Sequence, residues 1–470
     1  MQTRKDLYQA HRLMQQRLGM ALLQGEPDLP ESPLRRHNVA TFGGILLAVV
    51  LLAGFGIWGL IKPGGATKLT EPGQVLIEEE SGATYVFSQR DNRLLPVVNY
   101  VSARLLLDSP DVTVRNVSAA SLAGYARGPL VGIEGAPDSL PTRERLVHGP
   151  WSACVTEGAD ATGGRKAYVT LVGGVSVGGT PVGDGALVVE DGRRTWVLWA
   201  DRRMRVSASG VRALGAQPRK VPVAWLNAIP EGPDFAGPAI AGRGKRVRGA
   251  DGRVNAVVGQ VFTVPGVAGG PTRWYVLLSD GLAPITVTQA TLLLEDPASR
   301  AAYGRRPVRP ISIDAATANG SPSSKQVIGG GLPATMPKVA TPSATAPLCA
   351  VYASTRTGST RAVLTVGSTI GIPAPRSATG PEFFDQVLLP PGGGAVAGLL
   401  PGDGRLDSIS NFFLIEDQGR KYAVQSPDTL TKLGYEAADV APVPAQILHL
   451  IPDGPALDPV AARSPVEVTP

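Results

Sequence analysis

Residues 39–61 read VATFGGILLAVVLLAGFGIWGLI and contain no charged side chain. At about 1.5 Å rise per residue, a helix that begins at Val39 and ends at Ile61 spans roughly 35 Å, which crosses a bilayer with some tilt. A buried helix of a soluble domain would be expected to contain a charged position over this length. A cleaved signal peptide would have a shorter apolar core with fewer residues before it. The run therefore predicts one membrane-spanning helix that is retained.

The charges beside this segment set its expected orientation. Arg35 and Arg36 precede it, whereas Lys62 is the single close cation on the other side. Cytoplasmic flanks are enriched in positive side chains, so the N-terminus is predicted to be cytoplasmic. We expect a single-pass membrane protein with about 400 residues outside the cytoplasm.

Residues 1–38 are expected to form a cytoplasmic N-terminal amphipathic helix. Leu7, Met14, Leu18 and Leu22 recur at helical spacing, and the pattern ends at Gly25. A helix of about 20 residues has no core of its own, so this apolar stripe must be covered by something else. It either lies on the membrane surface or packs on a partner subunit, and the residues leave both alternatives open.

The composition favours short strands and argues against several classes of function. Gly (57) and Pro (42) make up about a fifth of the 470 residues, so turns are frequent. The charged residues behind the net charge of +6 are interspersed, which does not favour a nucleic-acid partner. The four histidines are scattered and the two cysteines lie 195 positions apart, unlike metal ligands. We therefore expect no metal and no cofactor.

Two short stretches match the consensus of a catalytic or nucleotide-binding motif, but neither has the flanking residues that the motif requires. Residues 174–178 read GVSVG, the spacing of a nucleophile elbow, but the following GTPVGDG cannot begin a helix. The stretch GGGAVA from Gly392 resembles a dinucleotide fingerprint, but Pro390 and Pro391 interrupt the strand that should precede it, so we expect a loop. GxxxxGK[ST] does not occur in the sequence. We assign no catalytic residue and do not expect an enzyme.

Four segments share an apolar strand that begins with an aromatic residue, an acidic turn, a second strand and a short helical stretch. They begin at Tyr85, Trp196, Tyr275 and Phe412. Asp, Asn and Gly at the turns are typical of β-hairpins. The sequence predicts four hairpin-plus-helix repeats, at residues 68–115, 183–240, 241–300 and 389–458.

A closer duplication links the second and fourth repeats. VPVAWLNAIPEGPDF from Val221 aligns without gaps to VPAQILHLIPDGPAL from Val443. By contrast, residues 317–347 lack periodicity and are predicted to be a flexible linker. Residues 459–470 are expected to be a loose tail.

The two cysteines lie in another pair of similar segments. SACVTEGADATGGRKAYVTLVG from Ser152 resembles LCAVYASTRTGSTRAVLTVG from Leu348, each a strand with Cys, a turn and a return strand. A pseudo-two-fold axis between the two hairpins would bring Cys154 and Cys349 together, in a central domain built from 149–182 and 348–388. We predict a disulfide there, with two buried free thiols as the alternative.

The predicted fold class is α+β: a single transmembrane helix is followed by an elongated extracytoplasmic body of β-hairpin/helix repeats around a central disulfide-linked β-rich domain. This order of elements closely resembles EccB, a core membrane component of type VII (ESX) secretion systems. The specific matches are DGRRTWVLWADRR from Asp191, VAWLNAIPEGP from Val223, FFLIEDQGRKYAV from Phe412 and VPAQILHLIPDGPALDP from Val443. The resemblance covers nearly the whole chain, with residues 319–347 the least comparable.

The resemblance implies a membrane complex with EccC, EccD, EccE and the mycosin protease, and a disulfide between Cys154 and Cys349. The expected function is a scaffold that links the inner-membrane translocon to its extracytoplasmic parts. Several similar surfaces on a repeat-built body suit self-association in a ring-like oligomer. Two alternatives are kept: an ATP-hydrolysing subunit, as family members have been described, and a cell-wall module that binds peptidoglycan.

Overall fold

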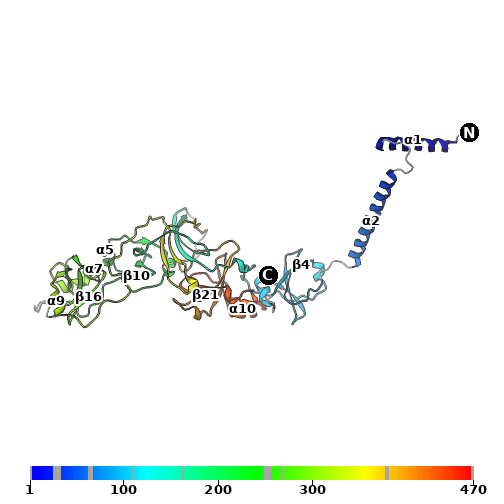
Figure 1. Cartoon of the computed structure of the whole chain (residues 1–470). Helices are drawn as coiled ribbons and strands as arrows, with labels where there is room; N and C mark the ends of the chain where they lie inside the picture. The colour runs from blue at the N-terminus through cyan, green and yellow to red at the C-terminus, as the bar shows by residue number, and fades with distance from the viewer. Residues whose placement is uncertain are drawn as a thin grey trace. The chain divides into compact units, whose positions relative to one another are not determined.

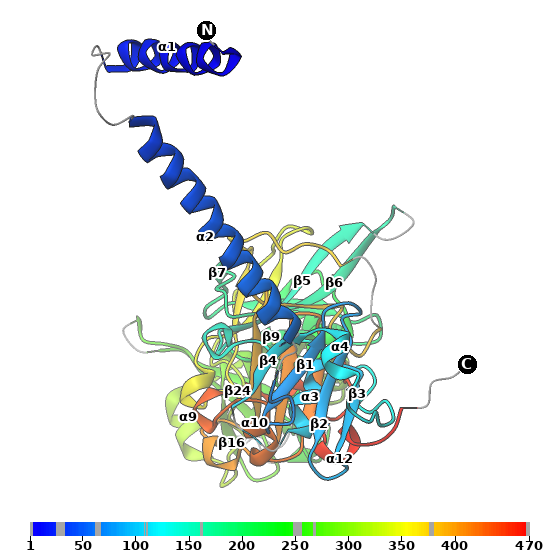
Figure 2. The same ribbon diagram turned by 90° about the vertical axis from the view of Figure 1, so that its right-hand side faces the viewer.

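The computed structural model describes residues 3–24, 33–61, 67–107, 109, 111–159, 163–247, 256–266, 269–375 and 380–466. The chain divides into two compact units. The first consists of Met1–Leu69, Glu78–Ser81 and Asn116–Tyr125, and the second of Thr70–Ile77, Gly82–Arg115 and Ala126–Pro470. The chain contains both helices and runs of consecutive, mostly antiparallel strands (Figure 1, Figure 2), so the protein belongs to the α+β class, as the sequence predicts.

The first unit contains two long helices, α1 (Arg4–Gln24) and α2 (Pro33–Ile61), and the short helix α4 (Ala119–Leu122). Both long helices are dark blue in Figure 1. The predicted span of residues 39–61 lies within α2, which begins earlier, at Pro33. Proline suits the first position of a helix because its φ is already helical and its missing N–H has no partner there.

Four four-stranded sheets share one strand order. Three consecutive strands form an antiparallel meander, and a fourth strand lies beside the first. In three of these sheets the fourth strand is parallel to the first. The strands of the first two sheets are β1 (Gln74–Glu78), β2 (Thr84–Ser88), β3 (Arg93–Val97) and β4 (Thr113–Val117), then β8 (Ala186–Glu190), β9 (Thr195–Trp199), β10 (Arg202–Val206) and β11 (Arg219–Lys220). Those of the other two are β14 (Val261–Val264), β15 (Arg273–Leu277), β16 (Leu282–Ile285) and β17 (Ile311–Ser312), then β21 (Gly394–Leu400), β22 (Phe412–Glu416), β23 (Lys421–Val424) and β24 (Val440–Pro444).

One helix follows the third strand of each sheet, and all four begin with the same kind of cap. The helices are α3 (Tyr100–Leu106), α5 (Ala208–Leu214), α7 (Val287–Glu295) and α10 (Pro427–Lys432). The side chains of Asn99, Ser207, Thr286 and Ser426 each accept a hydrogen bond from the backbone N–H three residues later. Such caps satisfy an N–H that lacks an intrahelical partner, which explains why the helices begin there.

A further segment runs parallel to the third strand of each sheet. It forms the bridges Val97 to Val131, Val206 to Phe235, Leu282 to Pro322 and Val424 to Leu457. In the second and fourth sheets this edge segment is the IPEGPDF or IPDGPAL end of the duplicated stretch, and α6 (Val223–Asn227) or α11 (Ala445–Leu448) precedes it. The duplication therefore begins where the fourth strand ends and marks a helix and an edge-covering segment. The edge-covering segment leaves fewer unpaired backbone groups at the sheet edge.

The central sheet has six strands in the order β20-β6-β5-β18-β19-β7. Its members are β5 (Trp151–Ala159), β6 (Arg165–Gly173), β7 (Thr180–Pro181), β18 (Leu348–Tyr352), β19 (Val363–Val366) and β20 (Gln386–Leu388). Figure 2 shows β5 and β6 side by side as a long hairpin. The remaining elements are β12 (Arg246–Val247), β13 (Ala256–Val257), α8 (Arg300–Tyr303), α9 (Ala315–Gly320), α12 (Pro459–Ala462) and the 3₁₀ turns Arg143–Arg145, Pro297–Ser299, Thr355–Thr357, Leu406–Ser408 and Ala437–Asp439.

Three segments that the sequence predicts to be a linker, a tail and a loop are more ordered in the structure. The segment 317–347 begins inside α9 and then has little regular structure, but Ala340 N–H donates to the carbonyl of Ala186 in β8. The tail from residue 459 begins as α12, with Ala462 fully buried. GGGAVA, expected to be a loop, enters strand β21 at Gly394. In each case long-range packing outweighs a local composition rich in Gly, Pro and small residues.

Candidate functional site

The two cysteines face each other on the central strands β5 and β18. Cys154 and Cys349 are cross-strand partners in an antiparallel pair, 4.1 Å apart between Cα atoms, and their sulfurs are bonded. Both side chains are fully buried and belong to one hydrophobic cluster with Val172 and Val177. The predicted disulfide is therefore present. It is a closed structural link between halves of the sheet that are distant in sequence, and no solvent-exposed thiol is involved.

The helix α2 contains one apolar segment, His37–Trp58, with a mean hydropathy of 2.3 and none of it buried in the protein. By length and composition it can cross a bilayer. The predicted end residue Val39 is exposed at 65%, whereas the side chains of Arg35, Arg36 and Ile61 lie outside the described residues. An apolar helix without protein packing is suited to a lipid environment.

The stripe predicted for the N-terminal segment lies on one long helix, α1. Leu7, Met14, Leu18 and Leu22 are exposed at 64%, 73%, 66% and 81%. Asp6 accepts hydrogen bonds from the N–H and hydroxyl of Thr3 at the start of this helix, which lowers the pKa of its carboxyl. In the part of the chain that the structure describes, no other residue covers the stripe.

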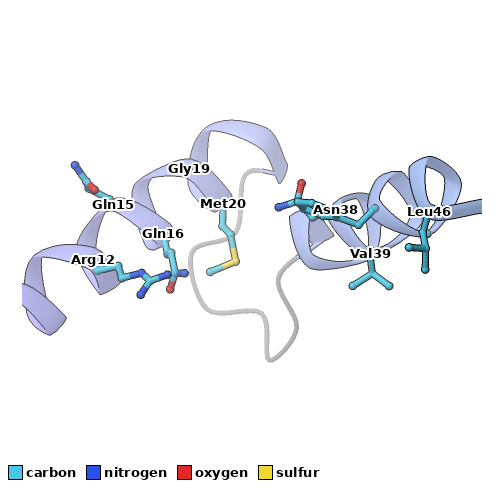
Figure 3. A pocket seen from close by; sticks show the side chains of 10 residues that line it. Arg12, Gln15, Gln16, Gly19, Met20, Asn38, Val39 and Leu46 are labelled. Atoms are coloured by element: carbon cyan, nitrogen blue, oxygen red, sulfur yellow. The ribbon is translucent and has the colours of Figure 1, made fainter. Parts of the chain in front are cut away.

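A hollow of about 940 Å³ lies between α1 and the first half of α2 (Figure 3). The side of α1 that lines it is mostly polar and includes Arg12, Gln15 and Gln16. The four residues of the apolar stripe do not line it. The hollow therefore does not account for the stripe, which stays available to a partner or a membrane surface.

The acidic turn residues of three of the four hairpins accept hydrogen bonds that hold local structure. Asp91 accepts a hydrogen bond from Ser88, and Asp417 accepts one from Gly392 N–H. Ser323 and Ser324 donate to Asp280 and hold the pKa of its carboxyl below the ordinary value. Among the residues that the structure describes, no group of three or more His, Cys, Asp or Glu side chains is placed to hold a metal ion.

One association was not apparent from the sequence: the first and fourth sheets share a hydrophobic core. Val101 and Leu105 of α3 belong to the same buried cluster as Leu414 and Leu430. At its edge, Arg143 pairs with Glu436 at 2.9 Å and with Asp439 at 3.0 Å. The apolar faces of the repeat helices indicate in the sequence that each helix is covered by something. They do not show which repeats pack against each other.

Comparison with known proteins places the whole chain in one family. The model described as "Type VII secretion system ESX-1, transport TM domain B" matches residues 1–470. A relative named ESX-3 secretion system ATPase EccB3, from Mycobacterium tuberculosis, is 25% identical over 95% of this chain and 86% of its own length. Another from M. tuberculosis, named ESX-5 secretion system ATPase EccB5, is 29% identical over 60% of this chain. That match spans 57% of the relative's length.

Solved structures show the same fold. A chain in the structure of an intact ESX-5 inner membrane complex has a TM-score of 0.63 and 24% identity, covering all of this chain and 96% of its own. A chain from the structure of an EccB3 dimer of the ESX-3 core complex has a TM-score of 0.62 and 24% identity, covering 83% of this chain and 99% of its own. Because the family model spans an apolar N-terminal helix and the entire disulfide-linked body, the chain is a member of the EccB family of type VII secretion membrane proteins.

Proposed function

We propose that this chain is a scaffolding subunit of a type VII (ESX) secretion membrane complex. The main support for this proposal is the family match over residues 1–470. The fold shared with a chain of the ESX-5 inner membrane complex adds to it. A single apolar helix without an ionisable residue between Val39 and Ile61 cannot line a conduit by itself. The role is therefore to anchor and position other subunits, linking the translocon to its extracytoplasmic parts.

The proposed topology puts the N-terminus in the cytoplasm and the body outside the inner membrane. Its support is the arginine pair Arg35 and Arg36 before the span and the disulfide after it. Stable disulfides of ordinary proteins form in oxidising compartments, not in the cytosol. In the body, the four sheets of equal strand order correspond to four proposed repeats of an elongated domain around the central sheet.

The proposed partners are EccC, EccD, EccE and the mycosin protease of the same system. The apolar stripe of α1 is the proposed cytoplasmic docking surface, since its four large residues are exposed. Copies of the chain are further proposed to associate in a ring-like oligomer. The EccB3 dimer of the ESX-3 core complex supports self-association, because EccB3 shares the fold of this chain.

Copurification tests the scaffold. The full chain, tagged after its last residue and extracted in mild detergent from its own host, should bring down the other membrane subunits, identified by mass spectrometry. A control chain with residues 1–24 removed should still carry the disulfide. Recovery of the full chain alone, under conditions that preserve other membrane complexes, would contradict the proposal.

Hydrolysis of ATP is the second candidate, because several relatives carry the word ATPase in their names. A Walker A loop, which binds phosphates in P-loop enzymes, does not occur in the sequence. Turnover by the purified chain that survives size-exclusion chromatography and is abolished by a point mutation in this chain would favour the enzyme. Retention of the chain on purified peptidoglycan would instead favour the cell-wall module.

A further inference from the structure

We propose that the first sheet carries a pocket for an anionic amphiphile with one alkyl chain, such as a fatty acid or a lysophospholipid. The pocket has a volume of about 820 Å³ and lies where the β2–β3 hairpin extends past the end of α3. This volume is within the usual range for small-molecule sites. The inference uses only residues of the second unit and the covalent link to α2, and does not depend on a role in secretion.

One end of the pocket is apolar. Val86 and Leu95 are cross-strand partners on the face that α3 covers, exposed at 2% and 9%. Leu107 and Val131 line the pocket beside them. Helix α3 ends at Leu106, so the part of this face nearest the hairpin turn has no helix above it. The pocket floor therefore opens directly onto the apolar core of this sheet.

The other end is polar and positively charged. Ser88 and Arg93 form the next cross-strand pair on the same face, because side chains alternate along a strand. Arg90 in the turn and Arg463 also line the pocket, against the single carboxylate of Asp91. Within the described part of the chain, Arg90 and Arg93 form no ion pair.

The second sheet has a larger side chain at the position equivalent to Val131, which explains why the first sheet contains a pocket. In the edge segments, Val131 faces Val97 at the register position where Phe235 faces Val206. Phe235 is fully buried and fills the second sheet's core together with Leu292 of α7. In the fourth sheet the equivalent residue is Leu457. The smaller valine leaves unfilled the volume that a larger side chain occupies in the related sheets.

The chemical class of the ligand follows from the two ends of the pocket and from the short segment that joins the pocket to α2. The floor is apolar, Arg93 lies about 7 Å further along the strand, and Arg90 lies in the turn beyond it. This arrangement fits a negatively charged head group on an alkyl chain. Pro72, part of the lining, follows the end of α2 at Ile61 by roughly eleven residues, which span at most about 40 Å. An anchored chain thus keeps this pocket within reach of membrane lipids. Sugars and nucleotides lack an extended apolar part to match the floor.

The test uses the full chain in host membranes and photoactivatable probes that carry an alkyne. The three probes are hexadecanoic acid, an anionic lysophosphatidylglycerol and a zwitterionic lysophosphatidylcholine. After illumination, crosslinks are mapped by mass spectrometry. We expect them in peptides that contain residues 86–107 or 129–131, with an anionic probe at least about fivefold ahead of the zwitterionic one. The better anionic probe distinguishes a free carboxylate from a lipid phosphate.

Three variants test the assignment of residues. Val131→Phe should fill the pocket and remove labelling, since Phe235 shows that the topology accommodates this side chain. Arg90→Glu with Arg93→Glu should reduce anionic labelling about fivefold or more, whereas Arg90→Lys with Arg93→Lys should retain it. Arg202→Glu, at the corresponding strand position of the second sheet, is the matched control. Equal labelling by the zwitterionic probe, labelling unchanged by Val131→Phe, or crosslinks only elsewhere would each overturn the proposal. Disulfide formation on a non-reducing gel verifies folding of every variant.

Discussion

The Nε–H of Arg104 donates a hydrogen bond to the carbonyl oxygen of Lys432 at 3.1 Å, joining residues 328 positions apart. Arg104 is only 7% exposed. Its guanidinium lies 2.8 Å from where a Cβ on Gly434 would be, and Gly434 has a φ of +92°. A side chain at residue 434 would be strained and would displace the arginine. This contact fastens α3 of the first sheet to the end of α10 in the fourth.

We expect Arg104→Ala to destabilise the body by about 1–3 kcal/mol, because it removes a partly buried hydrogen bond and the packing of a buried side chain between two sheets. Arg212→Ala is the matched control: Arg212 occupies the same position in α5 but is exposed. Its effect should stay within about 0.5 kcal/mol. Urea unfolding of the full chain measures both. Equal effects of the two substitutions would show that the buried contact contributes nothing.

The second prediction concerns the central disulfide, which closes a separation of 195 residues. Cys154→Ser with Cys349→Ser should lower the free energy of unfolding by about 2–5 kcal/mol, since the unfolded chain regains the freedom that the bond removes. The wild-type chain measured in excess reductant should approach the double variant. A thiol assay on the denatured, non-reduced chain should detect no free thiol, and detection of two would refute the bond.

Membrane topology is the third prediction. Alkaline phosphatase fused after the last residue should be active, because that enzyme needs an oxidising compartment to form its own disulfides. The same reporter fused before α1 should be inactive. Replacing Arg35 and Arg36 by Glu should reduce the correctly oriented fraction, since it removes the positive charges that favour the cytoplasmic side. Activity of the N-terminal fusion alone would reverse the assignment.

The fourth prediction concerns the stripe on α1. Changing Leu7, Met14, Leu18 and Leu22 to Ser should abolish copurification of the cytoplasmic and membrane partners but leave the disulfide-linked body intact. Gln9→Ser with Gln16→Ser changes the polar face of the same helix and should have no effect. If the leucine and methionine substitutions instead leave the complex unchanged, the stripe does not dock on a subunit.

The fifth prediction concerns pH. Burial raises the pKa of Glu416 above its ordinary 4.5, although Tyr422 donates a hydrogen bond to its carboxylate. The folded protein therefore holds this proton more tightly than the unfolded chain. As pH rises from the unfolded to the folded pKa, stability should fall by at most about 1.4 kcal/mol per unit.

Glu416→Gln should remove that fall, so the variant gains stability relative to wild type over the same interval. Urea unfolding at a series of pH values from about 4 to 8 measures it, with the exposed Glu382→Gln as control. Parallel pH curves for wild type and Glu416→Gln would contradict the assignment.

Local signals located most of the elements. The aromatic residues Tyr85, Trp196, Tyr275 and Phe412 each lie in the second strand of a meander, and a capped helix follows every hairpin. The first and fourth strands were missed. The fourth strand pairs with the first across the helix that lies between them in the chain, so its partner is distant in sequence. Gly394 and Gly398 explain one such miss. A Cβ at either position would meet side chains of Pro141 or Ile409 within 3 Å, so glycine is needed in strand β21.

The sequence by itself determined the apolar span, the hairpins, the family and the choice of Cys154 and Cys349, because each depends on neighbouring residues or on two similar segments. Only the tertiary structure decided that the first and fourth sheets share a core, that Val131 lines a pocket whereas Phe235 is fully buried, and that residues 459–466 pack as part of the body. These features depend on which apolar faces meet after the chain folds. Similar repeats have similar apolar faces, so the local sequence pattern does not predict which repeats pack together. Packing over the whole body determines that pairing.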